Sequence, residues 1–210
     1  MKQLIQECIN LQDQLNKQLD ENWKETRHPM DWFVAFYQEL AELVDTLHWK
    51  WWKNYGNQTV DEENIKIEIV DLFHFALSFI IQNEEDPLTF TYEMLSAYDD
   101  FSIETNGDVN DLDKARLIWL LQQENCHPLS TILVLMKLFN MSKEDLIKLY
   151  ILKNALNKLR YDIGYGGEYK KIWNGIEDNK YLFKLLDENI ASFDDAYEKL
   201  KSIYSEIHKQ

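Results

Sequence analysis

Apolar residues recur along this chain at intervals of three and four positions, the spacing that is typical of amphipathic helices. The first apolar stripe predicts a helix over residues 2–19 and consists of Leu4, Ile5, Cys8, Leu11 and Leu15. A polar stretch with Pro29 separates it from the next helix, whose predicted N-cap is Asp31. The pattern continues this helix to about Tyr55, where Gly56 ends it.

The rest of the chain predicts further helices and one unusual loop. A polar linker at 58–64 precedes a predicted helix that ends at about Gln82, and two further helices are predicted within 88–127, around a polar loop at 106–113. The next predicted helix runs from Pro128 to near Asn140. Another begins at the capping-box pattern Ser142–Asp145 and ends at about Arg160. Four of the six glycines fall within 161–180, so we predict a loop there. One or two helices from about 181 to 207 close the chain.

Composition supports an all-α fold class. The chain has 210 residues, 45% of them hydrophobic, whereas Gly (6) and Pro (3) are scarce and alternating β-branched patterns are hard to find. This length supports one ordinary core. We therefore expect a single domain over 1–210, in which residues 84–145 leave room for a helical subdomain.

The net charge of −15 argues against a surface that coats nucleic acid, which needs clustered Lys and Arg. It permits a small-molecule nucleotide substrate, because divalent cations bridge acidic side chains to phosphates. Cys8 and Cys126 offer neither a disulfide framework nor the spacing of metal ligands. The N-terminus lacks the apolar core of a signal peptide, and no apolar run approaches the roughly 20 residues of a membrane span. We expect a cytoplasmic protein that binds neither nucleic acid nor membrane.

Two pairs of acidic residues fall on the apolar sides of neighbouring helices. With about 100° per residue, Glu39 lies in the middle of an apolar stripe and Glu42 flanks it. That stripe consists of Trp32, Ala35, Phe36, Leu43 and Thr46. On the next helix, Glu68 and Asp71 repeat the arrangement. Their apolar neighbours are Ile65, Leu72, Phe75 and Phe79.

These four carboxylates have no basic partner on either stripe except Lys50, more than two turns from Glu42. A buried carboxylate costs several kcal/mol unless a charge or a metal compensates it. One such pair alone would ordinarily be read as surface acids or as partners of distant lysines. Two pairs on adjacent apolar stripes favour a site for a hard dication such as Mg²⁺ between two helices.

Several segments match a known family. They are Glu39-Leu-Ala-Glu42, Trp49-Lys-Trp-Trp-Lys53, Glu68-Ile-Val-Asp71 with His74-Phe75, and Lys153-Asn-Ala-Leu-Asn157 with Arg160, Gly164-Tyr165, Tyr169-Lys-Lys171, Trp173-Asn-Gly175 and Glu177-Asp-Asn179. The N-terminal segment 11–16 also fits. Over 11–82 and 150–180 the chain thus resembles the dimeric all-α dUTPases, which belong with the MazG-like enzymes to the all-α NTP pyrophosphatase superfamily.

The resemblance implies a helical bundle with a metal site between two core helices, and the hydrolysis of dUTP, and also of dUDP, to dUMP. Glu39, Glu42, Glu68 and Asp71 would hold two or more Mg²⁺ ions per site, for which Mn²⁺ can substitute. Either Glu39 or Glu42 would be the catalytic group that accepts a proton from the attacking water. The resemblance also implies a homodimer.

The resemblance assigns roles to two further sets of residues. Those that would bind phosphate are Lys153, Asn157, Arg160, Tyr165 and Lys171. Those that would lie near the nucleoside are Gln12, Asn16, Trp49, His74 and Phe75. Taken singly, each has an ordinary structural interpretation: the cations as solvated helix charges, the tryptophan as a core or interface aromatic, and the histidine as a satisfied core residue.

Two alternatives to a dUTP diphosphatase remain open at this point. The same chemistry could act on another substrate, as in a dCTPase/dUTPase or a broader MazG-like dNTP pyrophosphohydrolase, since uracil and cytosine differ at one exocyclic group. A non-catalytic nucleotide sensor on the same fold is the other alternative. The presence of all four acids together with Lys153 and Arg160 argues against the sensor.

Overall fold

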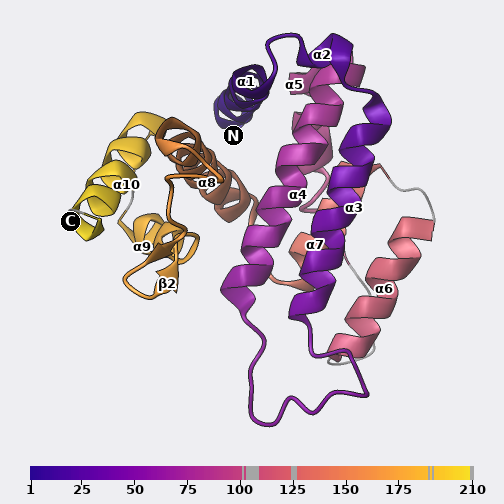
Figure 1. Ribbon diagram of the computed structural model, residues 1–210. Coiled ribbons are helices and arrows are strands. Elements are labelled where there is room, and N and C mark those ends of the chain that lie inside the picture. The colour runs from indigo at the N-terminus through magenta and orange to yellow at the C-terminus, as the bar shows by residue number, and fades with distance from the viewer. Residues whose placement is uncertain (101, 103–108, 124–126, 189, 191, 209–210) are drawn as a thin grey trace.

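A computed structural model of the protein describes residues 1–100, 102, 109–123, 127–188, 190 and 192–208. Over these residues the fold is a bundle of helices with one short hairpin, which confirms the predicted all-α class (Figure 1). Its elements are α1 (Lys2–Leu19), α2 (Trp23–Thr26), α3 (Pro29–Thr46), α4 (Glu62–Asn83), α5 (Pro87–Ser96), α6 (Asp111–Gln123), α7 (Pro128–Leu138), α8 (Lys143–Ile163), β1 (Ile172–Trp173), β2 (Ile176–Glu177), α9 (Lys180–Asp187) and α10 (Phe193–Ile207).

Helix α4 is the centre of the bundle. It runs beside α3 and also packs against α1, α7 and α8 (Figure 1). Its sequence is apolar on nearly every side, which is typical of a helix that is surrounded by protein. Its fully buried side chains include Ile69, Val70, Leu72, Phe73 and Leu77. The acids of α4 are therefore held on a helix that is packed against other elements on most of its sides.

The helices between residues 84 and 145 contribute to the same buried core. Leu95 of α5 and Leu129, Ile132 and Leu135 of α7 are buried together with residues of α4. Helix α5 packs against α1 and α7, and α7 packs against α4. This part of the chain thus packs directly on α4 and α1.

The start of α3 differs from the prediction. His28, not Asp31, is the N-cap, and Pro29 occupies the first helical turn. The Nδ1 atom of His28 accepts from the backbone N–H of Met30 at 3.2 Å, and Asp31 accepts from the backbone N–H of His28 at 3.0 Å. Asp31 therefore closes a reciprocal capping box from the third helical position, a role that its sequence position alone did not distinguish from an N-cap.

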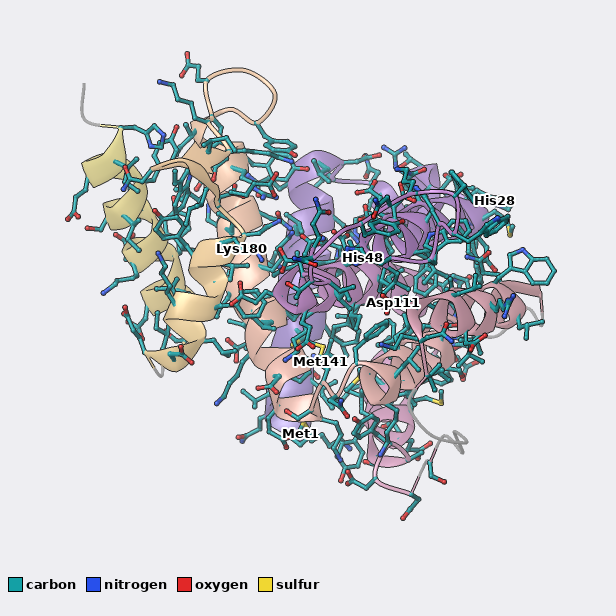
Figure 2. The ribbon with its side chains drawn as sticks, turned by 90° about the horizontal axis from the view of Figure 1, so that it is seen from below. Met1, His28, His48, Asp111, Met141 and Lys180 are labelled. Atoms are coloured by element: carbon teal, nitrogen blue, oxygen red, sulfur yellow. The ribbon has the colours of Figure 1, made fainter. Side chains whose placement is uncertain are left out.

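The end of α3 also differs, because the predicted continuation to Tyr55 is wrong. The helix ends at Thr46, whose hydroxyl donates to the carbonyl oxygen of Leu43 at 2.7 Å. Leu47 then turns into the core in an extended conformation, and the backbone N–H of His48 donates to Asp111 of α6 at 3.3 Å (Figure 2). Aromatic side chains lose rotamer freedom in a helix. The tryptophan-rich segment that follows therefore has little intrinsic preference for continuing α3.

The glycine-rich segment 161–180 is not only a loop. Strands β1 and β2 pair antiparallel within it, with Trp173 opposite Ile176. Asn174 and Gly175 connect them with φ values of 48° and 83°. A two-residue Asn-Gly connection with two positive φ values is the favoured turn of a tight hairpin, so the Asn-Gly pair was the signal that the loop prediction overlooked.

The predicted polar loop at 106–113 is only partly described. Residues 106–108 lie outside the described residues, and Asp111–Asp113 belong to α6. Among the described helices, none is both long and apolar enough to cross a membrane.

Candidate active site

A cavity of about 790 Å³ lies between α1, α3, α4, α8 and the hairpin. The side chains that line it include nearly all of the predicted site residues: Gln12, Asn16, Glu39, Glu42, Glu68, Asp71, His74, Phe75, Lys153, Asn157, Arg160, Tyr165 and Lys171. Trp49 is the exception. It packs against the core in the segment after α3, and it is not part of this lining. Its predicted nucleoside contact stays a prediction.

Three of the four predicted metal ligands converge across α3 and α4. One carboxylate oxygen from each of Glu39, Glu42 and Glu68 lies within 4.8 Å of the other two. Gln38 donates to Glu42 at 3.2 Å, and Asn64 donates to Glu68 at 3.1 Å. These two amides hold the Glu42 and Glu68 carboxylates in place without neutralising them.

The carboxylates of this cluster repel one another when they are ionised. Partial burial, together with the charges of neighbouring carboxylates, raises the pKa of Glu39 from 4.5 to about 7. Burial and the charge of Asp71 raise the pKa of Glu68 to about 7 as well. Acids whose ionised form is disfavoured in this way bind a cation in exchange for their protons. The donor set is made of hard oxygen ligands, which suits Mg²⁺.

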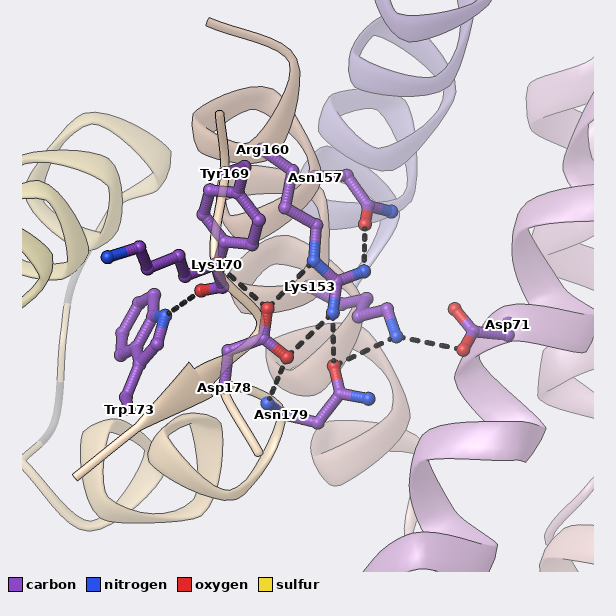
Figure 3. Close-up of polar contacts among 9 residues, drawn as sticks. All are labelled: Asp71, Lys153, Asn157, Arg160, Tyr169, Lys170, Trp173, Asp178 and Asn179. Atoms are coloured by element: carbon purple, nitrogen blue, oxygen red, sulfur yellow. Dashed lines mark hydrogen bonds and ion pairs between the residues drawn. The ribbon is translucent and has the colours of Figure 1, made fainter. Parts of the chain in front are cut away.

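Asp71 differs from the other three acids, and here the premise that all four lack a basic partner was wrong. The Nζ of Lys153, on α8, donates to Asp71 at 2.8 Å and to Asn179 at 3.1 Å (Figure 3). Lys153 is 3% exposed. Lys153 is more than 80 positions from Asp71 in the sequence and lies on another helix. A helical wheel drawn for α4 alone cannot predict such a partner.

The predicted phosphate-binding side chains come from the second half of α8 and from the segment that follows it, and they line the same cavity. Arg160 donates through Nη1 to Asn157 at 3.1 Å. The ring of Tyr165 lies below the Arg160 guanidinium at 5.6 Å and below the Lys171 Nζ at 5.5 Å. Three cations, Lys153, Arg160 and Lys171, thus face the carboxylate cluster across one cavity. Cations and a dication on opposite sides of a cavity can enclose a polyphosphate.

Two residues that contact the predicted phosphate-binding cations were not assigned from the sequence. Asp178 is 1% exposed and accepts from Arg160 twice, from Nε at 2.9 Å and from Nη2 at 2.8 Å (Figure 3). Asn179 accepts from both Lys153 and Arg160 at 3.1 Å. The Glu-Asp-Asn run after the hairpin was noticed as a motif, but only the fold shows that it faces α8. Asn64, Arg27 and Trp32 also line the cavity without having been predicted.

A buried polar cluster between α1 and α4 also lines the cavity. Gln12, Asn16 and His74 line it and are each 5% exposed or less. His74 Nδ1 lies 2.8 Å from the Oε1 of Gln12, and burial lowers the pKa of His74 to about 4. The ring is therefore neutral, and it can accept or donate one hydrogen bond at Nε2. Phe75 supplies an apolar wall beside it.

Comparison with known proteins identifies the family that this geometry belongs to. A family model with the description dUTPase matches residues 4–165, well over half of the chain. The matched region contains all four acids as well as Lys153 and Arg160, whereas Lys171, Asp178 and Asn179 lie beyond it. No curated protein of similar sequence matches the chain.

Proposed function

The chain belongs to the dUTPase family, in its all-α type, and is a hydrolase that acts on dUTP; we propose that it converts both dUTP and dUDP to dUMP with Mg²⁺ held by its four acids. One observation carries the metal proposal. Glu39, Glu42 and Glu68 bring carboxylate oxygens within 4.8 Å of one another, opposite buried cations in the same cavity.

The residues present fit Mg²⁺. None of the ion pairs among the described residues involves Glu39, Glu42 or Glu68. Hard oxygen donors without cationic partners are the ligands that this ion prefers, and Mn²⁺ has the same preference. We propose that Asp71 joins them and that the set holds two or more ions. When bound, these ions would neutralise phosphate charge and lower the pKa of an attacking water.

In this proposal the remaining site residues have separate roles in proton transfer, phosphate binding and the exclusion of water. Glu39 or Glu42 accepts the proton of the attacking water, since both reach the centre of the cluster. Lys153, Arg160 and Lys171 bind the phosphate oxygens from the other side, and Asn157 and Asn179 orient two of these cations. Tyr165, in the glycine-rich segment, covers Arg160 and Lys171 and reduces the access of water.

The nucleoside lies at the other end of the cavity in this proposal. Asn16 and His74 contact the uracil, and Phe75 packs beside the deoxyribose, where its ring excludes a 2′-hydroxyl. This order along the cavity places the phosphates between the acids of α3 and α4 and the cations of α8.

We further propose a homodimer in the cytoplasm. Trp51 and Trp52 are 77% and 58% exposed, so a second copy that covered them would remove a large apolar area from water. Cys8 is a free thiol, which suits a reducing compartment. Sedimentation of the purified protein tests the first proposal, and fractionation of the cell of origin tests the second.

Purified protein assayed with each deoxynucleoside triphosphate, and with dUDP, tests the reaction. We expect dUTP and dUDP to be hydrolysed to dUMP only when Mg²⁺ or Mn²⁺ is present, and a chelator to abolish turnover. Glu42→Gln should lower kcat by about 100-fold or more. Glu62→Gln, which removes an exposed acid at the start of α4, is the control and should leave kcat unchanged. Faster turnover of dCTP or dGTP than of dUTP would contradict the proposal.

A further inference from the structure

A buried serine lies behind the nucleoside end of the cavity and is not part of the cavity lining. Ser78 is 0% exposed, sits one turn after His74 on α4, and contacts the two amide side chains of α1 that line the cavity. Its hydroxyl is 3.0 Å from Gln12 Nε2 and 2.9 Å from Asn16 Nδ2. A side chain that touches two site residues without reaching the cavity can set their orientation.

The proton of the Ser78 hydroxyl takes part in a hydrogen bond within α4. Ser78 Oγ donates to the backbone carbonyl oxygen of His74, one helical turn earlier, at 3.0 Å. A hydroxyl has one proton, so Oγ can only accept from its other neighbours. An amide oxygen of Gln12 or Asn16 at the same distance would leave two oxygens in contact without a proton between them. The NH₂ groups of both amides must therefore face Ser78.

The orientation of Gln12 fixes the tautomer of His74. With its NH₂ group toward Ser78 and Asn16, the Oε1 of Gln12 faces Tyr150 and His74, at 2.9 Å and 2.8 Å. An amide oxygen only accepts, so His74 Nδ1 must carry the proton of the neutral ring. The other ring nitrogen, Nε2, is then an acceptor. It has no hydrogen-bond partner within the part of the chain that the structure describes.

Gln12 itself has no hydrogen-bonding capacity left for a ligand. Its two N–H groups are donated to Asn16 and Ser78. Its oxygen accepts from His74 and from the Tyr150 hydroxyl, whose single proton is shared with the carbonyl oxygen of Cys8 at 3.1 Å. Asn16 donates one N–H to Ser78 and retains the other. In the described part of the fold, His74 Nε2 is thus an unpaired acceptor that is itself buried, so a donor has to reach it through the cavity that His74 lines. Asn16 adds one N–H, and its Oδ1, which accepts from Gln12, keeps a second lone pair.

This pair matches uracil and mismatches cytosine. Uracil presents a donor at N3–H beside a carbonyl acceptor, whereas cytosine presents an acceptor at N3 beside an amino donor. His74 Nε2 accepts from the N3–H of uracil but would meet the unprotonated N3 of cytosine, which places two acceptors together. An Asn16 N–H that donates to the 4-carbonyl of uracil would meet the 4-amino group of cytosine, which places two donors together, whereas the 2-carbonyl is common to both bases. Buried groups left unpaired in this way cost more than a lost contact, which is how such sites reject an analogue.

We propose that Ser78 is a positioning residue that sets the preference for uracil over cytosine, by fixing Gln12 and through it the Nδ1–H tautomer of His74. The proposal rests on the proposed function, because it takes the nucleoside to bind at this end of the cavity. Without the Ser78 acceptor, Gln12 and Asn16 can both rotate their amides, and His74 can present a donor instead.

The first test reads the tautomer directly, without substrate. In ¹⁵N-histidine-labelled full-length protein, the two ring nitrogens of His74, assigned with His74→Gln, give distinct signals when protonated and unprotonated. We expect Nδ1–H in the wild type and a mixture of tautomers in Ser78→Ala. A wild-type ring protonated at Nε2 would overturn the proposal, even if Ser78→Ala fails to fold.

The second test measures the ratio of kcat/KM for dUTP to kcat/KM for dCTP. We expect Ser78→Ala to lower this ratio by about tenfold or more, and Ser78→Thr, which keeps the hydroxyl, to preserve both the ratio and the tautomer. Ser96→Ala is the matched control, because Ser96 also donates to a carbonyl one turn earlier, at 2.7 Å, but on the exposed side of α5. An unchanged ratio in Ser78→Ala, or an alanine-like ratio in folded Ser78→Thr, would contradict the proposal. Wild-type protein that does not hydrolyse dUTP would instead refute the proposed function, and the tautomer would still decide the role of Ser78.

Discussion

Arg160 and Asp178 form a two-point ion pair that is almost wholly buried, with N–O distances of 2.8 and 2.9 Å. Tyr169 donates to the same carboxylate at 2.7 Å, and the backbone N–H of Asn179 donates to it at 2.8 Å. The pair joins the end of α8 to the residue that follows the hairpin. The position of the guanidinium in the cavity therefore depends on the fold of the glycine-rich segment.

Asp178→Asn should cost both stability and substrate affinity. The variant leaves the Arg160 charge buried without its partner, so we expect the free energy of unfolding to fall by about 3 kcal/mol. The guanidinium should also lose its fixed orientation, so KM for dUTP should rise by about tenfold or more. Denaturant unfolding and steady-state kinetics measure the two effects.

A solvent-exposed ion pair provides the control for this variant. Glu188 and Lys199 pair at 3.0 Å, and both side chains are about half exposed, at 49% and 48%. Glu188→Gln should change the free energy of unfolding by less than about 1 kcal/mol and leave KM unchanged. Equal destabilisation by the two variants would show that burial of the Arg160 pair does not determine its importance.

Lys153→Met should weaken the binding of the substrate and strengthen the binding of Mg²⁺. The variant removes the proposed phosphate contact of Lys153, so kcat/KM for dUTP should fall by about 10- to 100-fold. It also frees Asp71 from its partner at 2.8 Å, which leaves the acidic cluster more negative. The substrate-free variant should therefore bind Mg²⁺ more tightly than the wild type in a calorimetric titration.

Lys158→Met, on the same helix, is the matched control. Lys158 pairs with Asp162 at 2.7 Å on the side of α8 that faces α10, and neither residue lines the cavity. Neither its kinetics nor its affinity for Mg²⁺ should differ from those of the wild type. Weaker Mg²⁺ binding by Lys153→Met than by this control would contradict the arrangement in which Lys153 competes with the metal for Asp71.

The sequence predicted the helices and the acidic cluster because both depend on local periodicity. Glu39 and Glu68 each lie mid-stripe on their own helix, so a wheel drawn for one helix is enough to find them. The end of α3 was missed because Leu47 and His48 leave the helix to contact the core and α6, and these contacts are not local.

The same reasoning explains which site residues were missed. Asp178 and Asn179 act on Arg160 and Lys153, which precede them by 18 and 26 positions, across a hairpin. Ser78 looks like an ordinary small residue within an apolar helix, and only its distances to two side chains of α1 reveal a role. The face of a single helix can be predicted from sequence periodicity, whereas contacts between two elements can be identified only once the fold is known.

Tyr204 should support the glycine-rich segment from α10. Its ring stacks on Tyr169 at 5.1 Å with an interplanar angle of 10°, and it contacts Trp173 of the hairpin at 5.6 Å. Tyr204→Ala should lower the free energy of unfolding by about 3 kcal/mol and raise KM for dUTP, since Tyr169 helps to hold Asp178. Tyr204→Phe keeps the ring and loses only the 3.3 Å contact with the backbone N–H of Lys170, so its KM should stay near the wild-type value. Similar kinetics for the two variants would mean that ring stacking does not position the segment.

The acidic cluster should make both stability and metal binding depend on pH. Glu39 and Glu68 have pKa values of about 7 in the folded, metal-free protein and an ordinary value of 4.5 when unfolded, so between these pH values the folded state binds more protons. The metal-free protein should therefore lose stability as pH rises through this window, and Mg²⁺, which competes with the same protons, should bind more tightly as pH rises. The increase in Tm caused by Mg²⁺ should be larger at about pH 8 than at about pH 6, and Glu39→Gln should reduce this difference. An increase in Tm of equal size at both pH values would show that these two acids do not exchange protons for the metal.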